Sequence, residues 1–201
     1  MTPEAFAEMF NVPRGTMDRL HRQHALLIDW QEKMNLVGPA TLEDVWWRHF
    51  ADSAQLARLV PKDQFWLDMG SGAGFPGMVL ATMSWGNFVL VDSVAKKCRF
   101  LETVRDELGL QNVAVRNARV ETLPTLGVDV ATARAAAPLK TLFEWAIRHV
   151  RPGGTFLFPK GARWAEEVQP ARQKFLFDLD AIPSMTNPHA RILIARNLKR
   201  L

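Results

Sequence analysis

The ten residues from Asp68 to Gly77, DMGSGAGFPG, constrain the fold more than any other part of the chain. They follow an apolar run typical of a strand and precede a segment of helical composition, so the glycines form a strand-to-helix turn. Counted from Gly72, the stretch spells G-x-G-x-x-G, the turn with which many proteins hold the phosphates of a dinucleotide. Counted from Asp68, it spells D-x-G-x-G-x-G, a turn that suits a ligand without phosphates.

The segments after Pro61 alternate between strands and helices. We predict strands at Phe65–Met69, Phe88–Val91, Val113–Arg116, Val128–Ala133 and Thr155–Pro159, and helices at Gly77–Ser84, Val94–Leu108, Leu139–His149 and Trp164–Lys174. Strands separated by helices predict a parallel sheet that binds ligands at the carboxyl ends of its strands. Two last strands, at Phe177–Ile182 and Arg191–Asn197, are predicted to form a hairpin on the sheet edge.

The first sixty residues are predicted to be helical. A capping Thr2 before Pro3 predicts a short helix to Phe10, and apolar spacing predicts a second helix over Arg14–Asn35. Residues 41–44, TLED, resemble a capping box that opens a third helix, which runs to about Leu59. We therefore predict an α/β fold in two parts. Residues 1–60 form a helical N-terminal extension, and residues 61–201 form a Rossmann-like domain with helices on both faces of a parallel sheet.

Charge separates the two possible ligands of the glycine turn. A carboxylate beside a pyrophosphate would repel it, so Asp68, at the end of the first strand, argues against a dinucleotide. S-adenosylmethionine, which carries a cationic amino group and a sulfonium, would find this carboxylate favourable. Asp92, about eighteen residues past Gly74 at the end of the second strand, can accept hydrogen bonds from the ribose of either ligand.

Simpler explanations exist for the same residues. The glycines could form a tight turn that binds nothing, and Asp68 and Asp92 could each cap a helix. We favour S-adenosylmethionine as the cofactor because the glycines, the preceding acid and Asp92 agree with one another.

The composition of the chain indicates which binding partners and which cellular compartment to expect. The chain has 201 residues, a formal net charge of +4 and a sequence pI of about 9.6, which weakly favours a polyanionic partner. The single cysteine, Cys98, excludes an internal disulfide and fits a reducing, cytoplasmic location. The five histidines lack metal-ligand spacing, so we expect no metal. We expect no signal peptide, because Glu4 and Glu8 charge the N-terminus, and no membrane span, because glycines and Pro76 interrupt the uncharged run at 69–91.

Short motifs spread over most of the chain form a recognisable series. They are Asn35-Leu36-Val37, Arg48-His49-Phe50-Ala51-Asp52-Ser53, the glycine turn through Phe75-Pro76-Gly77, Val91-Asp92-Ser93, Lys96-Lys97-Cys98-Arg99-Phe100-Leu101, Arg119-Val120-Glu121, Ala133-Arg134-Ala135 with Pro138-Leu139, and Lys160-Gly161. In this order they resemble the glucose-inhibited division protein B family, the RsmG methyltransferases of the bacterial small ribosomal subunit. Each motif is weak by itself, but the series is highly specific.

The resemblance implies a class I methyltransferase that transfers a methyl group from S-adenosylmethionine to N7 of one guanine in 16S rRNA. We expect it to act as a monomer on the small ribosomal subunit and not on a membrane. In the family, the cofactor is contacted at positions matching Gly70, Phe75, Val120, Glu121 and Arg134. The predicted cofactor site is therefore Asp68, Gly70, Gly72, Gly74, Phe75, Asp92, Val120, Glu121 and Arg134.

This reaction needs little from the protein beyond positioning. Guanine N7 has an exposed lone pair, so no general base is required before attack, whereas a cytosine C5 reaction would need a cysteine and Cys98 is better explained as core. We name Arg134 as the catalytic residue in a positioning role. Its guanidinium could bind the cofactor carboxylate, the guanine O6 edge or a phosphate, and the simpler alternative is a salt bridge at a strand end.

A base in folded RNA must be unpaired or flipped into a pocket while nearby phosphates are held. We predict RNA contacts for Asn35, His49, Lys96, Lys97, Arg119 and Lys160, with ordinary solvated helix faces as the alternative for most of them. His49, Asp52 and Ser53 share one helix face. This face could cover the methyl-transfer pocket or form a buried polar network that fixes the helix to the sheet.

Three other functions fit parts of the sequence. A small-molecule methyltransferase of the same fold would leave the basic surface without a role. An NAD-binding oxidoreductase or sensor would use Gly72, Gly74 and Gly77 as a dinucleotide turn. A ribosome-binding assembly factor would keep the fold without turnover.

Overall fold

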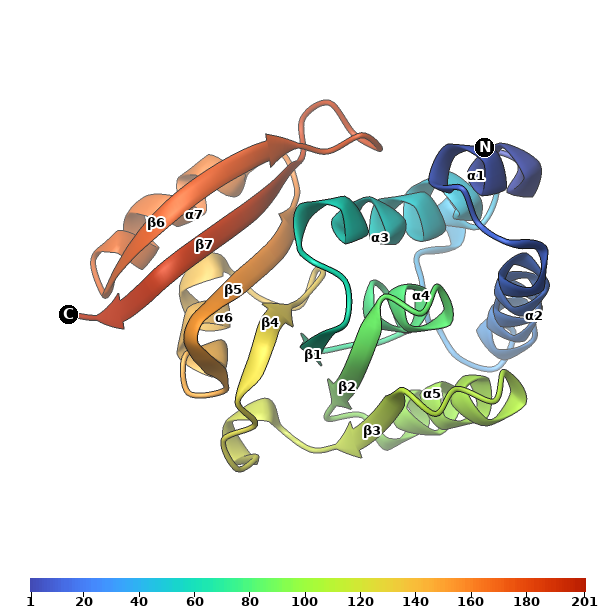
Figure 1. Cartoon of the computed structure of the whole chain (residues 1–201), viewed down its shortest axis with the longest axis horizontal. Coiled ribbons are helices and arrows are strands. Elements are labelled where there is room, and N and C mark those ends of the chain that lie inside the picture. The colour runs from blue at the N-terminus through green and yellow to red at the C-terminus, as the bar shows by residue number, and fades with distance from the viewer.

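A seven-stranded sheet lies at the centre of the computed structural model, which describes residues 1–201 (Figure 1). Its strands are β1 (Gln64–Met69), β2 (Gly86–Asp92), β3 (Val113–Asn117), β4 (Val128–Thr132), β5 (Val150–Lys160), β6 (Phe175–Pro183) and β7 (Arg191–Arg200). The order is β3-β2-β1-β4-β5-β7-β6, with β1 to β5 parallel and β7 antiparallel to both neighbours. The predicted parallel sheet and edge hairpin are confirmed.

The chain order reverses between β1 and β4, the two central strands. From β1 the chain builds outward through β2 and β3, and it then returns to β4 on the other side of β1. The connections leave these strands in opposite directions, so a crevice opens at their carboxyl ends. This is where a ligand site is expected in a sheet of this kind.

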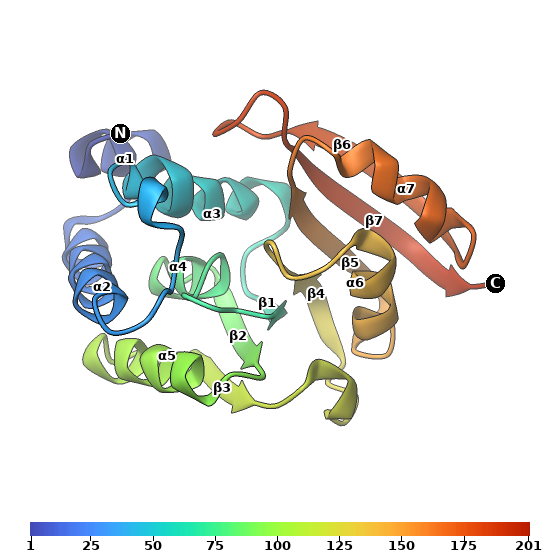
Figure 2. The same cartoon turned by 180° about the vertical axis from the view of Figure 1, so that it is seen from behind.

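Helices cover both faces of the sheet, as predicted. One hydrophobic cluster joins α4 (Gly77–Thr82) and α5 (Ala95–Glu107) to Trp66 and Phe88, and a second joins α6 (Leu139–Ala146) and α7 (Trp164–Arg172) to Leu67 and Val89. Adjacent strand residues thus face opposite sides, which is the alternation of a sheet buried on both faces. In Figure 1, α7 lies behind the hairpin and α6 behind β5, and in Figure 2 both helices lie in front of these strands.

The first two helices begin where the sequence predicts. Helix α1 (Pro3–Phe10) is capped by Thr2, whose Oγ1 accepts the N–H of Ala5. Helix α2 (Arg14–Gln31) ends at Gln31 and not at Asn35. The Gln31 side chain accepts the N–H groups of Leu36 and Val37 and so stabilises a turn in place of the last helical residues.

The third helix begins at Trp46 and not at Thr41. It continues through the π-helical η2 (Trp46–Ala51), α3 (Asp52–Ala54) and the 3₁₀-helical η3 (Gln55–Leu59). Before it lies only a 3₁₀ turn, η1 (Pro39–Thr41). The predicted capping box does not form, because the Thr41 hydroxyl bonds to the carbonyl oxygen of Gly38 and to His49 and not to a backbone N–H of the following turn.

Residues 1–60 share a core with the rest of the chain. Phe6, Leu20 and Phe50 are completely buried in the same hydrophobic cluster as Met78 of α4 and Phe100 of α5. The division predicted at residue 60 marks a change of secondary structure, but no boundary in the core accompanies it. None of the helices has the length and apolar character needed to cross a membrane.

Candidate active site

Two adjoining cavities open at the carboxyl edge of the parallel strands. Their volumes are about 560 and 410 Å³, and both are lined by Gly70, Lys97 and Ala135. Further walls of the larger cavity are formed by residues in the ranges 36–52, 70–75, 159–167 and 184–191. The smaller cavity is completed by segments within 91–94, 118–121 and 136–145. Together they occupy the crevice at the reversal of the strand order.

The glycines of the turn are required for two different reasons. Gly70 and Gly72 line the larger cavity with left-handed φ angles of +67° and +54°, which a glycine adopts without strain. Gly74, which we expected in the cofactor site, and Gly77 line neither cavity. A Cβ on Gly77 would lie 2.5 Å from Leu90 Cδ2, so the packing of α4 on β2 excludes a side chain there. Of the three glycines in the G-x-G-x-x-G pattern, Gly74 and Gly77 therefore serve the packing of the helix, and only Gly72 lines a cavity.

Four backbone N–H groups of the turn, and that of Met78 just after it, are used within the protein. Ser71 donates to Val91 O at 3.0 Å, Gly72 to Asp92 Oδ2 at 2.9 Å, Gly74 to Ser71 O at 2.7 Å, Gly77 to Asp68 Oδ2 at 3.0 Å and Met78 to Gly74 O at 2.8 Å. A pyrophosphate site needs such groups free to bind the anion. The N–H groups of Gly70, Ala73 and Phe75 at the larger cavity have no partner in the protein, so the hydrogen bonds of the turn do not by themselves exclude a dinucleotide.

Asp68 differs from its predicted role. We expected its carboxylate to attract the cationic amino group of the cofactor, but it is completely buried and lines neither cavity. Its Oδ2 accepts the N–H of Gly77, the first residue of α4, so Asp68 holds the start of that helix. Burial raises the pKa of this carboxyl to about 7, although the Gly77 N–H and the charge of Arg134 act to lower it.

Asp92 lines the smaller cavity from the end of β2. Its Oδ1 accepts the N–H of Val94 and its Oδ2 that of Gly72, both at 2.9 Å. Each carboxylate oxygen keeps a second lone pair, so Asp92 can stabilise the start of α5 and still accept hydrogen bonds from a ribose. Two further residues of the predicted cofactor site, Val120 and Glu121, reach the same cavity from the 3₁₀ turn η4 (Val120–Thr122).

Arg134 lines the larger cavity from the loop after β4. Its Nη1 donates to the Arg48 carbonyl oxygen and to Asp52 Oδ2, both at 3.2 Å, and its Nη2 lies 2.8 Å from His49 Nδ1. The guanidinium carbon lies 4.9 Å from the centre of the Phe75 ring, a cation–π contact. Arg134 thus combines the salt bridge and the pocket position that the sequence left as alternatives.

His49 lies in the same wall and is held neutral. Its ring stacks on Phe75, with centroids 4.9 Å apart and planes at 20°. Because Arg134 can only donate, His49 Nδ1 accepts and the proton is on Nε2, which donates to Thr41 Oγ1 at 2.7 Å. Burial, followed by the charges of Arg134 and Arg48, lowers the pKa of His49 to about 3.

The helix face with His49, Asp52 and Ser53 has both of the roles left open by the sequence. His49 and Asp52 line the larger cavity, whereas Ser53 is completely buried and donates to the His49 carbonyl oxygen at 2.7 Å. Asp52 also accepts hydrogen bonds from Gln55 and Thr186. The face therefore covers the cavity and anchors the helix through one polar network.

The basic residues predicted to contact RNA are not equally placed. Lys97 lines both cavities, and the exposed Arg119 lines the smaller one. Asn35 and Lys96 are exposed and line neither cavity. These two side chains are accessible to RNA only outside the cavities.

Lys160 lines the larger cavity, but its charge is balanced within the protein. Its Nζ lies 2.7 Å from Glu167 Oε2 and donates to the Ala137 carbonyl oxygen at 2.9 Å. Its ammonium is therefore less available to a phosphate than the sequence suggested. The ion pair instead joins the end of β5 to α7, and the bond to Ala137 joins the same side chain to the loop after β4.

Cys98 is buried in the core, as predicted, and lines neither cavity. Its thiol donates to the Asp92 carbonyl oxygen at 3.3 Å, and burial raises the pKa of the thiol. The site therefore has no cysteine nucleophile of the kind that attack on a pyrimidine carbon would need.

The turn between β6 and β7 was missing from our predicted site. Ser184, Thr186, Asn187 and Arg191 line the larger cavity from this turn. The signal was present in the predicted topology, since a strand antiparallel to the end of the fifth strand must begin at the carboxyl edge. The observed pairing of Lys160 with Arg191 places the turn at that edge.

The strand order, with its reversal at β1 and its antiparallel hairpin, and the glycine turn after β1 define a Rossmann-like, class I methyltransferase fold, and the family given below makes S-adenosylmethionine its cofactor. Solved structures share this fold. A SAM-dependent methyltransferase from Aquifex aeolicus matches with a TM-score of 0.60 at 16% sequence identity, covering 79% of this chain and 97% of that one. M. jannaschii TYW2, solved in complex with AdoMet, matches with a TM-score of 0.59 at 12% identity, covering 76% of each chain.

Sequence comparison gives the family. A profile of the family described as rRNA small subunit methyltransferase G matches residues 16–193. Two proteins named Ribosomal RNA small subunit methyltransferase G are similar over nearly the full length. The one from Hyphomonas neptunium is 42% identical, covering 98% of this chain and 95% of its own, and the one from Paramagnetospirillum magneticum is 41% identical, covering 100% and 98%. The chain belongs to this family, which confirms the resemblance noted in the sequence.

Proposed function

We propose that this protein transfers the methyl group of S-adenosylmethionine to N7 of one guanine in 16S rRNA, acting as a monomer on the small ribosomal subunit in the cytoplasm. Family membership supports the rRNA substrate. The observation that carries the proposal is the pair of joined cavities. The smaller cavity presents hydrogen-bond acceptors for a nucleoside, and the larger cavity has Arg134 and the neutral His49 in its wall.

The residues present fit S-adenosylmethionine. In the smaller cavity, Asp92 has lone pairs free for ribose hydroxyls, and Val120 offers apolar surface to an adenine. In the larger cavity, Arg134 suits the carboxylate of the methionine portion. Family membership, and not the hydrogen bonds of the turn, counts against NAD.

The joined cavities leave room for an acceptor base. Their volumes of about 560 and 410 Å³ place them in the range of ordinary small-molecule pockets. We assign the smaller cavity to the adenosine portion of the cofactor. The larger cavity then receives both the methionine portion and a guanine flipped out of the RNA.

The chemistry requires alignment and no proton transfer before attack. When bound, the cofactor supplies an electrophilic methyl group on a sulfonium. His49 has both ring nitrogens engaged and a pKa lowered to about 3, so it takes up no proton near neutral pH. Arg134 holds a fixed positive charge in the wall of the site, where it orients an anionic or carbonyl oxygen.

RNA is held by the cations at the mouths of the cavities. Lys97 lines both cavities and Arg119 lines the smaller one, so these two side chains are the best placed to reach phosphates beside a flipped base. Lys160 is tied to Glu167 and serves mainly to hold the site together. Asn35 and Lys96 contribute only to a surface outside the cavities.

One assay tests the whole proposal. The protein is incubated with methyl-labelled S-adenosylmethionine and small subunits from a strain that lacks the activity, and the rRNA is then digested to nucleosides. We expect label only in N7-methylguanosine, at no more than one methyl group per 16S rRNA. Naked 16S rRNA and large subunits serve as comparison substrates, and label in another nucleoside, in protein or in small molecules would refute the proposal.

A further inference from the structure

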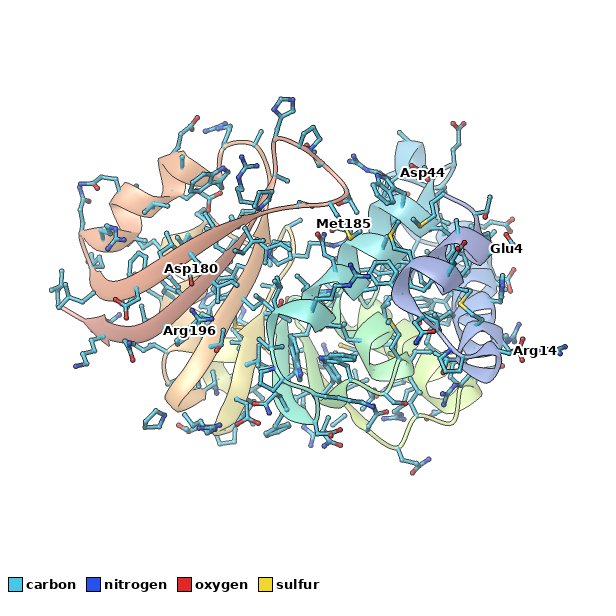
Figure 3. All side chains as sticks on the ribbon, turned by 45° about the horizontal axis from the view of Figure 1, so that its top comes forward. Glu4, Arg14, Asp44, Asp180, Met185 and Arg196 are labelled. Carbon is cyan, nitrogen blue, oxygen red and sulfur yellow. The ribbon has the colours of Figure 1, made fainter.

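The turn between β6 and β7 reaches across the larger cavity to the third helix. Figure 3 places Met185, in this turn, between the hairpin and the helix that contains α3. The Met185 N–H donates to Gln55 Oε1 at 3.0 Å, and Gln55 Nε2 donates to Ser184 Oγ at 3.2 Å. The two elements are far apart in the sequence, so these bonds fix the turn in place against the helix.

Thr186, one residue further along the turn, holds a carboxylate of the cavity wall. Its hydroxyl donates to Asp52 Oδ1 at 2.6 Å, and Gln55 Nε2 donates to the same oxygen at 2.9 Å. The other oxygen, Oδ2, faces Arg134 Nη1 at 3.2 Å. The Asp52 and Arg134 side chains are only 17% and 18% exposed, so water cannot replace these contacts freely.

The N–H donors of Arg134 are only partly used within the protein. A guanidinium has five N–H groups, and three of those on Arg134 are used by Arg48, Asp52 and His49. The Nε–H and one N–H of Nη2 stay available in the cavity wall. Two N–H donors on one planar group match a carboxylate.

We infer that Thr186 is a positioning residue for the cofactor: by holding Asp52 it fixes the orientation of Arg134, and so it determines how well Arg134 binds the cofactor carboxylate. This inference rests on the proposed function, which places that carboxylate beside Arg134. It extends the site to a turn that carries no part of the glycine or acidic motifs. It also gives the hairpin at the sheet edge an indirect part in cofactor binding, through Asp52 and Arg134.

Binding of S-adenosylmethionine, measured by calorimetry, tests the inference without RNA. Thr186→Val keeps the side-chain shape and removes the hydroxyl. We expect its dissociation constant to rise about three- to tenfold, the range for one lost hydrogen bond. Thr186→Ser keeps the hydroxyl and should bind nearly as the unaltered chain does. Asp180→Asn breaks the exposed ion pair with Arg196 on the same hairpin (Figure 3) and should leave binding unchanged.

A double-mutant cycle separates positioning through Arg134 from a general effect on the fold. In an Arg134→Ala background, we expect Thr186→Val to cause no further loss of affinity. An additive loss, an equal loss in Thr186→Ser, or unchanged binding by Thr186→Val would each overturn the inference. Thermal unfolding of every variant identifies a loss caused by misfolding. If the cofactor binds but no rRNA is methylated, the proposed function fails while this test still stands.

Discussion

The charge of Arg134 is balanced inside the site by Asp52, and its guanidinium also contacts His49 and the Phe75 ring. One charged group thus joins the third helix, the glycine turn and the loop after β4. Most of its surface is withdrawn from water, which strengthens its interaction with any oxygen brought into the cavity.

Substitution of Arg134 by alanine tests this role. We expect Arg134→Ala to lower the rate of rRNA methylation about a hundredfold or more, the usual cost of removing one preorganised charged donor. The cooperative unfolding transition should persist, at lower denaturant, because Asp52 loses its partner. Rates are measured by label transfer to small subunits, and full activity in this variant would reduce Arg134 to a structural residue.

Asp68 gives a prediction of pH dependence. Burial raises its folded-state pKa from 3.8 to about 7, so between these values the folded state keeps a proton that the unfolded state releases. The contribution of this residue to stability is therefore largest at low pH and is lost as pH rises toward 7. An asparagine in its place would not ionise and could still accept the Gly77 N–H through its amide oxygen.

We therefore expect the stability of Asp68→Asn relative to the unaltered chain to increase between pH 5 and 7. The slope should approach about 1.4 kcal/mol per pH unit and flatten above pH 7. Urea unfolding at each pH measures this difference, with the exposed Asp180→Asn as the control. A difference independent of pH would mean that Asp68 ionises normally in the folded state.

Among the elements, the junction of β1, the glycine turn and α4 leaves no space for a side chain at Gly77. A Cβ on Gly77 would lie 2.5 Å from Leu90 Cδ2 and 2.7 Å from Asp68 Oδ2. The helix cannot move away, because Asp68 holds its first N–H. The short α4 is thus fixed on the sheet by contacts that leave no space for one methyl group.

Gly77→Ala should lower the free energy of unfolding by about 1–3 kcal/mol, the usual cost of overpacking a tight core. Gly15→Ala is the matched control, since nothing lies within 4 Å of a Cβ there and its helical position favours alanine by up to about 1 kcal/mol. Urea denaturation compares both variants with the unaltered chain. Equal stability of the two variants would contradict the close packing of α4.

At the scale of the whole molecule, the N-terminal helices complete both the core and the site. Phe6, Leu20 and Phe50 are completely buried beside α4 and α5, and His49 and Asp52 form part of the cavity wall. Because the core is shared, we expect the segment to be necessary for folding of the sheet domain. Figures 1 and 2 show these helices along the same side as α4 and α5.

Deletion of residues 1–60 should therefore prevent cooperative folding of the remaining chain. The apolar surfaces of α4 and α5 would face water, and the glycine turn would lose the stacked His49. Circular dichroism during urea unfolding measures the result against the full chain. A sharp transition in the truncated chain, together with binding of S-adenosylmethionine, would contradict the shared core.

The sequence by itself determined the order of strands and helices, the parallel sheet, the edge hairpin and the family. These features depend on local periodicity, on turn residues and on a series of motifs, all of which are read along the chain. It also placed Asp92 at the cavities, because residues at the carboxyl ends of neighbouring parallel strands meet at one edge, and the family resemblance placed Phe75 and Arg134 there.

Only the tertiary structure decided which partner each polar or charged side chain contacts. Asp68 accepts a hydrogen bond from the first residue of α4, and Lys160 forms an ion pair with Glu167. Thr186 donates a hydrogen bond to Asp52, a residue 134 positions away. The third helix begins later than predicted because Thr41 bonds to Gly38 and His49 and does not cap it. Burial and the choice of hydrogen-bond partner depend on distance in space, which a pattern of residue types along one chain does not contain.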